Sequence, residues 1–430
     1  MKMRIDASAT LTGTRSCRLM LSLAMISANT ACSSFLDDLL DVENPGTVLE
    51  DTLRDPTNAS LLVAGLMNDF ACAFAGYIVA GGAIGTEVAW GDTNTFDYDR
   101  RTWTSSGGVY ATGTCSVMSS TLAVYTPLST ARWSADNAHQ ILSGFTDAQV
   151  PNRGALLAAA SAYSGYSHLL LGEAMCGASI DGGPMLSRDQ LSVLAEQKLT
   201  AAITEGSAAN DASLVNMALV GRARARINLS RATAGKAAEA AADAAQVPDG
   251  FSKMALYAAT DVRSSNQVYW WINEQGRAAV DSPFWNLTFQ GVPDPRVAVT
   301  QSGKQTQDGF TPWVLQTKYT SRGASIPIAK WAEAQLIIAE VKGGAAAIAI
   351  INTLHQRAGL PAFSSSDPVE IRQQVIEERR RELFVESHHL GDMIRFGIPF
   401  LPSAGTPYKP TGGGVYGAMT CLPYPDVERS

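Results

Sequence analysis

Residues 367–387 read DPVEIRQQVIEERRRELFVES and contain the clearest helix signals in the chain. Asp367 is a good helix N-cap, Pro368 suits the first helical position, and Glu370 stands at the third position, as in a capping box. We therefore expect a helix that runs to about the end of this stretch. The consecutive charged residues 377–382 cover more than one helical turn, so some of them must face the protein interior. The run predicts a buried, structural ion pair rather than a catalytic group.

Most of the remaining chain also has helical periodicity. Between Arg153 and Met175, apolar and small residues recur at spacings of three and four, which places them on one face of a long helix. Two alanine-rich segments further on are similar to a tetratricopeptide hairpin. We therefore predict an all-α fold of tetratricopeptide-like helical hairpins. The expected helices are 57–70, 125–142, 153–175, 188–205, 213–229, 232–245, 329–341, 345–358 and 368–387.

Two long segments interrupt these helices. Residues 71–120 and 248–327 are rich in glycine and aromatic residues, and the tail 397–430 is rich in proline and glycine. Long segments of this kind are typically functional or disordered, and their aromatic residues argue against disorder. Within the first segment, Gly81–Gly85 is predicted to be a loop. A rigid helical scaffold that carries irregular aromatic surfaces is typical of a binding protein.

The first residues of the chain are predicted to be a signal peptide. A basic segment precedes the apolar run Leu19–Ile26, which is too short to cross a bilayer. Ala31 followed by Cys32 suits cleavage at a lipid-modified cysteine, and a plain secretory signal with an incidental cysteine is the alternative. We expect residues 1–31 to be a lipoprotein signal peptide and residues 32–56 to be an acidic tether. No other stretch approaches about 20 uninterrupted apolar residues, so no transmembrane helix is expected.

The composition argues against several classes of function. The chain has 430 residues, with 33 Lys and Arg against 40 Asp and Glu, which gives a net charge of −7. Because no basic cluster occurs, nucleic-acid binding is not expected. The chain has five histidines, and the adjacent His388 and His389 would point in different directions on a helix, so we predict no metal site. The sequence contains no GxSxG, HExxH or Walker A motif, and we expect neither an enzyme nor a bound cofactor.

Cysteines beyond the predicted anchor provide candidate disulfides. In an oxidising compartment four cysteines could form two disulfides, with three possible pairings, or could remain free buried thiols. No CxxC pair occurs, so a zinc ribbon or a thioredoxin-like site is not expected. The four residues are Cys72, Cys115, Cys176 and Cys421.

Tryptophans in the two irregular segments are the predicted ligand-binding residues. The flat C–H faces of sugars stack on aromatic rings, while polar side chains bind the hydroxyl groups. A tryptophan in glycine-rich sequence is less easily explained by core packing, although packing stays the alternative for each one. The candidates are Trp90, Trp103, Trp270, Trp271, Trp285 and Trp313.

Several motifs, in order along the chain, resemble those of the SusD/RagB family of outer-membrane nutrient-binding lipoproteins. The matching stretches are Cys32–Asp37 with Val42–Pro45, Tyr125–Leu142, Arg153–Gly172, Asp294–Arg296, Lys318–Tyr319, Ile328–Glu340, Ile351–Leu360, Ile371–Gly397 and Pro423–Glu428. The resemblance implies one compact SusD-like unit, with an N-terminal helical part at 57–247 and a C-terminal part at 248–430. The motifs are mostly scaffold, so they transfer no ligand residue.

The resemblance also implies a location and a function. We expect an outer-membrane, surface-facing protein, lipid-anchored through Cys32 and without enzymatic activity. It would capture a glycan or another nutrient and pass it to a TonB-dependent, SusC-like transporter. Two alternatives stay open. One is a tetratricopeptide-like lipoprotein scaffold for protein or peptide docking, and the other is a hydrolase with carboxylate pairs such as Glu87/Asp92 or Asp97/Asp99.

Overall fold

The computed structural model describes residues 50–93, 98–104, 109–115, 122–410 and 413–428. Residues Arg54–Ser430 form one compact unit, and the short helix α2 (Glu50–Leu53) belongs to a separate N-terminal unit. The predicted signal peptide and the predicted lipid anchor Cys32 lie outside the described residues.

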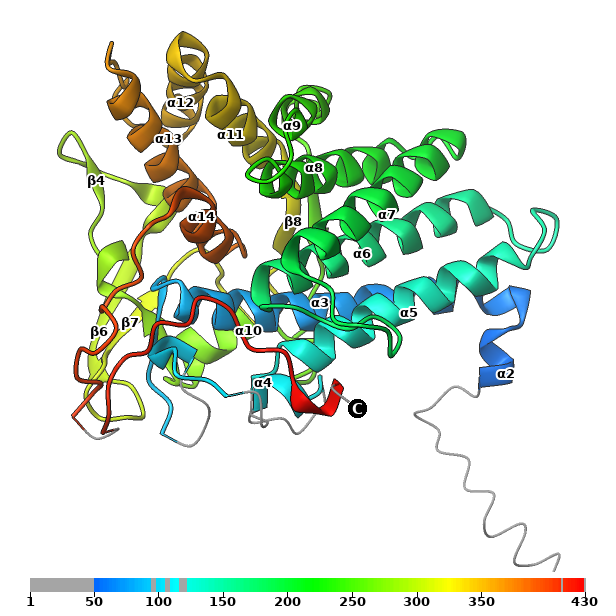
Figure 1. Cartoon of the computed structure of the whole chain (residues 1–430), viewed down its shortest axis with the longest axis horizontal. Helices are drawn as coiled ribbons and strands as arrows, with labels where there is room; N and C mark the ends of the chain where they lie inside the picture. The colour runs from blue at the N-terminus through cyan, green and yellow to red at the C-terminus, as the bar shows by residue number, and fades with distance from the viewer. Residues whose placement is uncertain (1–49, 94–97, 105–108, 116–121, 411–412, 429–430) are drawn as a thin grey trace, which may run out of the picture. The chain divides into compact units, whose positions relative to one another are not determined.

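Helices make up most of the regular structure, which confirms the prediction of a mostly helical fold (Figure 1). The α-helices of the large unit are α3 (Ala59–Ile84), α4 (Val109–Thr112), α5 (Tyr125–Ser143), α6 (Arg153–Ala174), α7 (Arg188–Ala208), α8 (Ala212–Leu229), α9 (Lys236–Ala244), α10 (Gln267–Tyr269), α11 (Trp331–Lys342), α12 (Gly344–Ala358), α13 (Pro368–Glu382) and α14 (His389–Phe396). Single-turn helices are η1 (Pro56–Asn58), η2 (Tyr98–Arg100), η4 (Ser282–Phe284), η5 (Pro295–Val297) and η6 (Asp426–Glu428), and η3 (Trp270–Glu274) is π-helical.

From Phe70 to Ile84, helix α3 is buried on all sides and carries no charged residue. Residues Pro56–Ile84 are long and apolar enough to cross a membrane by length and composition, but 72% of the most apolar window is buried inside the protein. A helix that is hydrophobic all round is typically a core helix. The sequence predictions that this helix ends at residue 70 and that Gly81–Gly85 forms a loop were wrong. The glycines are kept in the helix by close packing. A Cβ at Gly82 would lie 2.9 Å from Val88 Cγ2, so the helix can approach β1 this closely only with glycine at that position.

Helices α5 to α9 pack one after another as consecutive hairpins, and α5 and α6 contact α3 (Figure 1). Close approach depends on small residues, since a Cβ at Gly165 of α6 would lie 2.6 Å from Leu199 Cγ of α7. The helix starts are capped as the local sequence allows. Ser187 forms a complete capping box with Gln190 at the start of α7, and Asp211 accepts from Leu214 N at 2.9 Å at the start of α8.

The charged run in α13 is partly buried, as predicted. Glu378 and Arg379 are 0% and 2% exposed. Arg379 binds both carboxylate oxygens of Asp392 in α14, with its Nε 2.8 Å from Oδ2 and its Nη2 2.9 Å from Oδ1. Arg296 lies in η5, whose N-cap is Asp294, and it donates from Nη1 to Glu378 Oε2 at 2.7 Å. The run therefore fastens α13 to α14 and to η5.

The ends of α13 differ in part from the sequence prediction. Asp367 caps the helix by accepting from Val369 N at 2.8 Å, as expected. Glu370 does not complete a capping box, because its Oε2 accepts from Ser365 Oγ at 2.7 Å instead. The chain leaves the helix after residue 382, since Val385 and Ser387 have φ angles of 49° and 74°, and α14 then begins as a separate, unpredicted helix.

Short strands organise the segment 248–327, which the sequence predicts to be irregular. Each sheet in the described part of the chain has two antiparallel strands. The pairs are β1 (Val88–Trp90) with β3 (Ala278–Val280), β2 (Ser252–Ala255) with β8 (Ile326–Lys330), β4 (Thr288–Phe289) with β5 (Val292–Pro293), and β6 (Val299–Gln305) with β7 (Pro312–Gln316). The β1–β3 pair joins the two aromatic-rich segments to each other.

Two disulfides connect distant parts of the chain. Cys72 in α3 is bonded to Cys115, and Cys176, which follows α6, is bonded to Cys421 in the C-terminal tail. Backbone bonds reinforce the second link, because Cys176 N donates to Leu422 O at 2.8 Å. The tail thus lies against the N-terminal helices although it is otherwise irregular, as the sequence predicts.

Candidate ligand-binding site

Three of the predicted ligand-binding tryptophans lie in the protein interior. Trp90, Trp103 and Trp271 are 0%, 6% and 1% exposed. The Trp90 and Trp271 rings stack with centroids 5.4 Å apart, and Tyr98 meets Trp90 edge-on at 5.1 Å. These rings fill the junction where β1 meets β3, so they have no free face for a ligand. For these three residues the low exposure favours the core-packing alternative over ligand contact.

The other three predicted tryptophans are half-buried and anchored by neighbouring groups. Trp285 Nε1 donates to Val280 O at 2.7 Å, and Trp313 Nε1 donates to Ile272 O at 2.6 Å. Trp270 lies edge-on to Trp271, and the Arg322 guanidinium lies 5.8 Å from the Trp270 ring centroid. Each ring keeps part of its surface exposed, so ligand contact by these three stays a prediction.

A more exposed tryptophan was missed by the sequence analysis. Trp133 is 54% exposed on α5, more than any of the six predicted tryptophans. Its helix buries Leu128, Ala131 and Ala135, and Trp133 lies off that face. A helical projection of residues 125–142 places Trp133 on the polar face, but the prediction considered only the tryptophans of the irregular segments.

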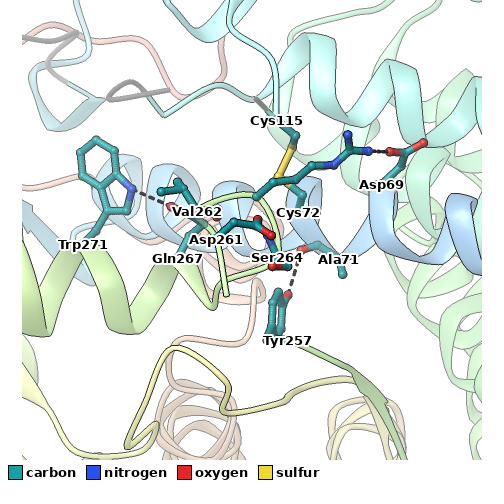
Figure 2. Close-up of a disulfide and its surroundings, with 11 residues drawn as sticks. Asp69, Ala71, Cys72, Cys115, Tyr257, Asp261, Val262, Ser264, Gln267 and Trp271 are labelled. Atoms are coloured by element: carbon teal, nitrogen blue, oxygen red, sulfur yellow. Dashed lines mark hydrogen bonds and ion pairs between the residues drawn. A yellow bond between two sulfur atoms is a disulfide. The ribbon is translucent and has the colours of Figure 1, made fainter. Parts of the chain in front are cut away.

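A surface groove lies between α3, α5 and the Cys72–Cys115 disulfide (Figure 2). We call this cavity of about 250 Å³ the disulfide groove; it is lined by Asp69, Thr114, Cys115, Pro127, Thr130 and Arg263. A smaller depression of about 30 Å³ shares several of these residues and continues to Gly76 and Gln267. The disulfide holds the segment with Thr114 against α3 and so forms one wall of the groove.

Asp69, which is labelled in Figure 2, forms an ion pair with Arg263 in the groove. The side chains of Asp69 and Arg263 are 19% and 42% exposed. Ser134 Oγ on α5 also donates to Asp69 Oδ2 at 2.8 Å. A turn positions Arg263, because Asp261 Oδ1 accepts from Ser264 N at 2.8 Å, and this bond lowers the pKa of Asp261. The pair offers a carboxylate acceptor and guanidinium donors side by side at the surface.

Gln267 connects the groove to the aromatic core. Its Nε2 donates to Val262 O at 2.5 Å, and its Oε1 accepts from Trp271 Nε1 at 3.0 Å. Gln267 begins α10, which continues into the π-helical turn η3, and π-helical turns occur frequently at functional sites. The predicted aromatic segment therefore supports the groove from behind, although its buried rings do not line it.

The carboxylate pairs considered for hydrolysis have structural surroundings. Glu87 is 2% exposed and accepts from Val385 N at 2.9 Å, and burial raises the pKa of Glu87 to about 8. Asp92 is buried 3.6 Å from Arg277 Nη1, and Asp99 accepts from Tyr408 Oη at 2.7 Å. Asp97 lies outside the described residues. Neither pair lines the disulfide groove, and we therefore assign these groups no catalytic role.

Metal-ligating clusters are not found among the residues that the structure describes. His388 and His389 are both buried, with His388 Nδ1 3.7 Å from Glu333 Oε1 and the His389 ring edge-on to Phe284. Burial lowers the pKa of His389 to about 4, so this histidine is neutral near pH 7.

Residues 315–420 match the SusD_RagB model, described as the SusD family. The resemblance to the SusD/RagB family is confirmed. The matched segment contains α11 to α14 and the buried ion pair of Arg379 with Asp392. The groove residues Asp69, Thr130 and Arg263 all lie outside it, so the match supports the scaffold and assigns no ligand residue.

Solved SusD-like structures share the fold of this chain. A SusD homologue from Bacteroides thetaiotaomicron superposes with a TM-score of 0.64 at 14% identity, covering 89% of this chain and 97% of that one. A SusD-like carbohydrate-binding protein from Bacteroides vulgatus gives 0.59 at 16% identity, covering 80% and 83%. Surface glycan-binding protein A from Bacteroides thetaiotaomicron, solved with laminarihexaose, gives 0.57 at 13% identity, covering 79% and 90%. No curated protein matches the chain. SusD-family proteins are binding proteins rather than enzymes, which agrees with the lack of catalytic motifs in the sequence.

Proposed function

We propose that this SusD-family protein is a lipid-anchored, surface-facing protein of the outer membrane that captures a glycan and delivers it to a TonB-dependent transporter. The observation that carries the proposal is the SusD-like fold over most of the chain, including the segment matched to the family. Solved proteins with this fold are named as carbohydrate-binding or glycan-binding.

The surface chemistry supports a sugar as ligand. The disulfide groove presents hydroxyl groups, a carboxylate and a guanidinium, and Trp133 lies exposed on the same helix as Thr130. Sugars are bound by this combination of polar hydrogen-bonding groups and aromatic stacking surfaces.

Glycan binding is tested with the mature protein from Cys32 onward, produced without the lipid. We would measure binding to immobilised neutral polysaccharides, uronate-containing polysaccharides and peptide mixtures. Saturable binding to a polysaccharide is expected. Binding to peptides alone would favour the docking-scaffold alternative and contradict the proposal.

Delivery to a transporter is tested by gentle extraction of the tagged, full-length protein from membranes of the cells that make it. We expect a large β-barrel transporter to copurify with it. Recovery only as a free monomer under conditions that preserve other outer-membrane complexes would contradict this part of the proposal, while leaving glycan binding intact.

A further inference from the structure

The described residues that line the disulfide groove carry no net charge. Among its described lining residues, Asp69 and Arg263 are the only ionisable side chains, and they neutralise each other as an ion pair. The remaining lining residues are two threonines, a proline and a disulfide-bonded cysteine. A bound anion would lie next to the Asp69 carboxylate and a bound cation next to the Arg263 guanidinium, so the groove disfavours both.

The ion pair leaves donors and acceptors available to a neutral ligand. Within the described part of the chain, the Arg263 side chain donates only to Asp69, through Nη2, and because its Nε is buried, Nη1 is the group left for a ligand. Asp69 accepts from Arg263 and from Ser134 Oγ. Two ionised carboxylate oxygens provide about four acceptor sites, so Asp69 can accept further hydrogen bonds. A hydroxyl group both donates and accepts, and two neighbouring hydroxyl groups could therefore bridge this pair.

Trp133 is exposed on α5, the helix that contributes Thr130 to the groove. Residues 130 and 133 are i and i+3 on the helix, so their side chains are neighbours on its surface. Thr130 lines the groove and Ser134 binds Asp69, and Trp133 lies between them in the sequence. Its exposed ring provides a flat apolar face on the same helix as the groove residue Thr130.

We propose that the disulfide groove is the glycan-binding site, and that the Asp69–Arg263 pair selects neutral sugars over charged ones. This inference rests on the proposed glycan-binding function and specifies its site and its class of ligand. The preference for neutral sugars requires both charges of the pair. If the Asp69 carboxylate charge is removed, the Arg263 guanidinium stays in the groove without a counter-charge and attracts anionic sugars. The pair should therefore act as a specificity determinant as well as a source of affinity.

The test compares binding of a panel of neutral oligosaccharides, laminarihexaose included, and of oligogalacturonates to the mature protein and three variants. Wild type should bind a neutral member of the panel and bind oligogalacturonates at least ten-fold more weakly. Arg263→Met should weaken neutral binding by roughly 10- to 100-fold, the usual cost of losing hydrogen bonds to a charged group. Asp69→Asn should change the preference toward oligogalacturonates by ten-fold or more.

A matched control separates the groove from general effects of losing a surface ion pair. Arg357→Met removes the exposed pair of Arg357 with Asp249, which lies outside the groove, and should leave both affinities unchanged. Thermal midpoints of all variants verify folding. If neutral glycans bind and Arg263→Met leaves the affinity unchanged, the groove assignment is wrong while the proposed function survives. Tighter wild-type binding of oligogalacturonates overturns the selection rule. If no glycan in either panel binds, both the function and the site fall.

Discussion

Removing Arg296 should destabilise the protein strongly, because its guanidinium neutralises two buried carboxylates. Arg296 Nη2 lies 2.8 Å from Asp294 Oδ2, and its Nη1 lies 2.7 Å from Glu378 Oε2. Both carboxylate side chains are 0% exposed, and the Arg296 side chain is 11% exposed. Burial alone would lower the pKa of the Arg296 guanidinium, but the hydrogen bonds to these two carboxylates raise that pKa overall.

The expected cost of Arg296→Met is about 3–5 kcal/mol of the free energy of unfolding, the usual penalty for leaving buried charges without their partner. Methionine keeps much of the aliphatic stem, so the loss is mainly electrostatic. Two contacts reduce the penalty toward the lower end of this range. Arg381 Nη1 stays 3.3 Å from Asp294 Oδ2, and His355 Nε2 stays 2.7 Å from Glu378 Oε1.

Urea unfolding followed by circular dichroism measures this cost at pH 7 and at pH 5. The loss of stability should be smaller at pH 5. In the variant, burial raises the pKa of the Asp294 carboxyl and the Arg296 guanidinium is no longer there to lower it, so the carboxyl can take up a proton and lose its buried charge. Arg153→Met is the control, since its partner Asp147 is 83% exposed, and it should cost less than about 1 kcal/mol. A loss at Arg296 no larger than the loss at Arg153 would refute the reasoning.

Four further outcomes are expected. Burial lowers the pKa of His168 to about 4, so between pH 6.5 and 4 the unfolded chain binds a proton that the folded protein does not. Lowering the pH through this range should therefore remove up to about 3 kcal/mol from the free energy of unfolding. The variant His168→Gln should show a weaker dependence of the unfolding midpoint on pH over the same range. Replacing Cys176 and Cys421 together by serine removes a disulfide between residues 245 apart and should lower the free energy of unfolding by roughly 5 kcal/mol, measured by denaturant unfolding. An unchanged unfolding midpoint would show that the noncovalent contacts of the tail are enough to hold it in place. Trp271→Ala should cost about 3–5 kcal/mol of stability as a core substitution, whereas Trp133→Ala should leave the melting temperature nearly unchanged and lower glycan affinity; the reverse pattern would contradict the assignment of the two rings. Cys32→Ala should leave the protein soluble after fractionation or retained with an uncut signal, and membrane association after cleavage would require a different anchor.

The sequence predicts the helical scaffold well because its signals are local. Caps such as Ser187 and Asp367 and the periodicity of residues 153–175 act within one or two turns, so they can be identified without knowledge of the fold. Helix α3 was cut short in the prediction because residues 71–120 were assigned to one irregular segment from their composition, whereas tertiary packing keeps the chain helical to Ile84. The β1–β3 and β2–β8 pairs were missed because the paired strands are distant in the sequence.

The candidate site was predicted less well for the same physical reason. Asp69 and Arg263 are 194 residues apart, and neither belongs to a motif that would indicate their pairing. The sequence correctly places aromatic residues in the two irregular segments, but it does not reveal that Trp90 and Trp271 stack on each other inside the protein. Whether a ring is buried depends on contacts such as the β1–β3 pair, which form only in the folded chain.

The link between Cys176 and the C-terminal tail has a consequence for the kinetics of folding. Leu422 N donates to Ala174 O at 2.9 Å, so the end of α6 gains backbone partners from a segment that follows it by more than 240 residues. Contacts with such long sequence separation slow folding, because the entropy of closing the loop must be overcome before the contact stabilises anything. A chain that emerges N-terminus first can form α6 early, but it completes the surroundings of that helix only after residue 421 has arrived. Its folding time should therefore be governed by closure across 245 residues rather than by helix formation.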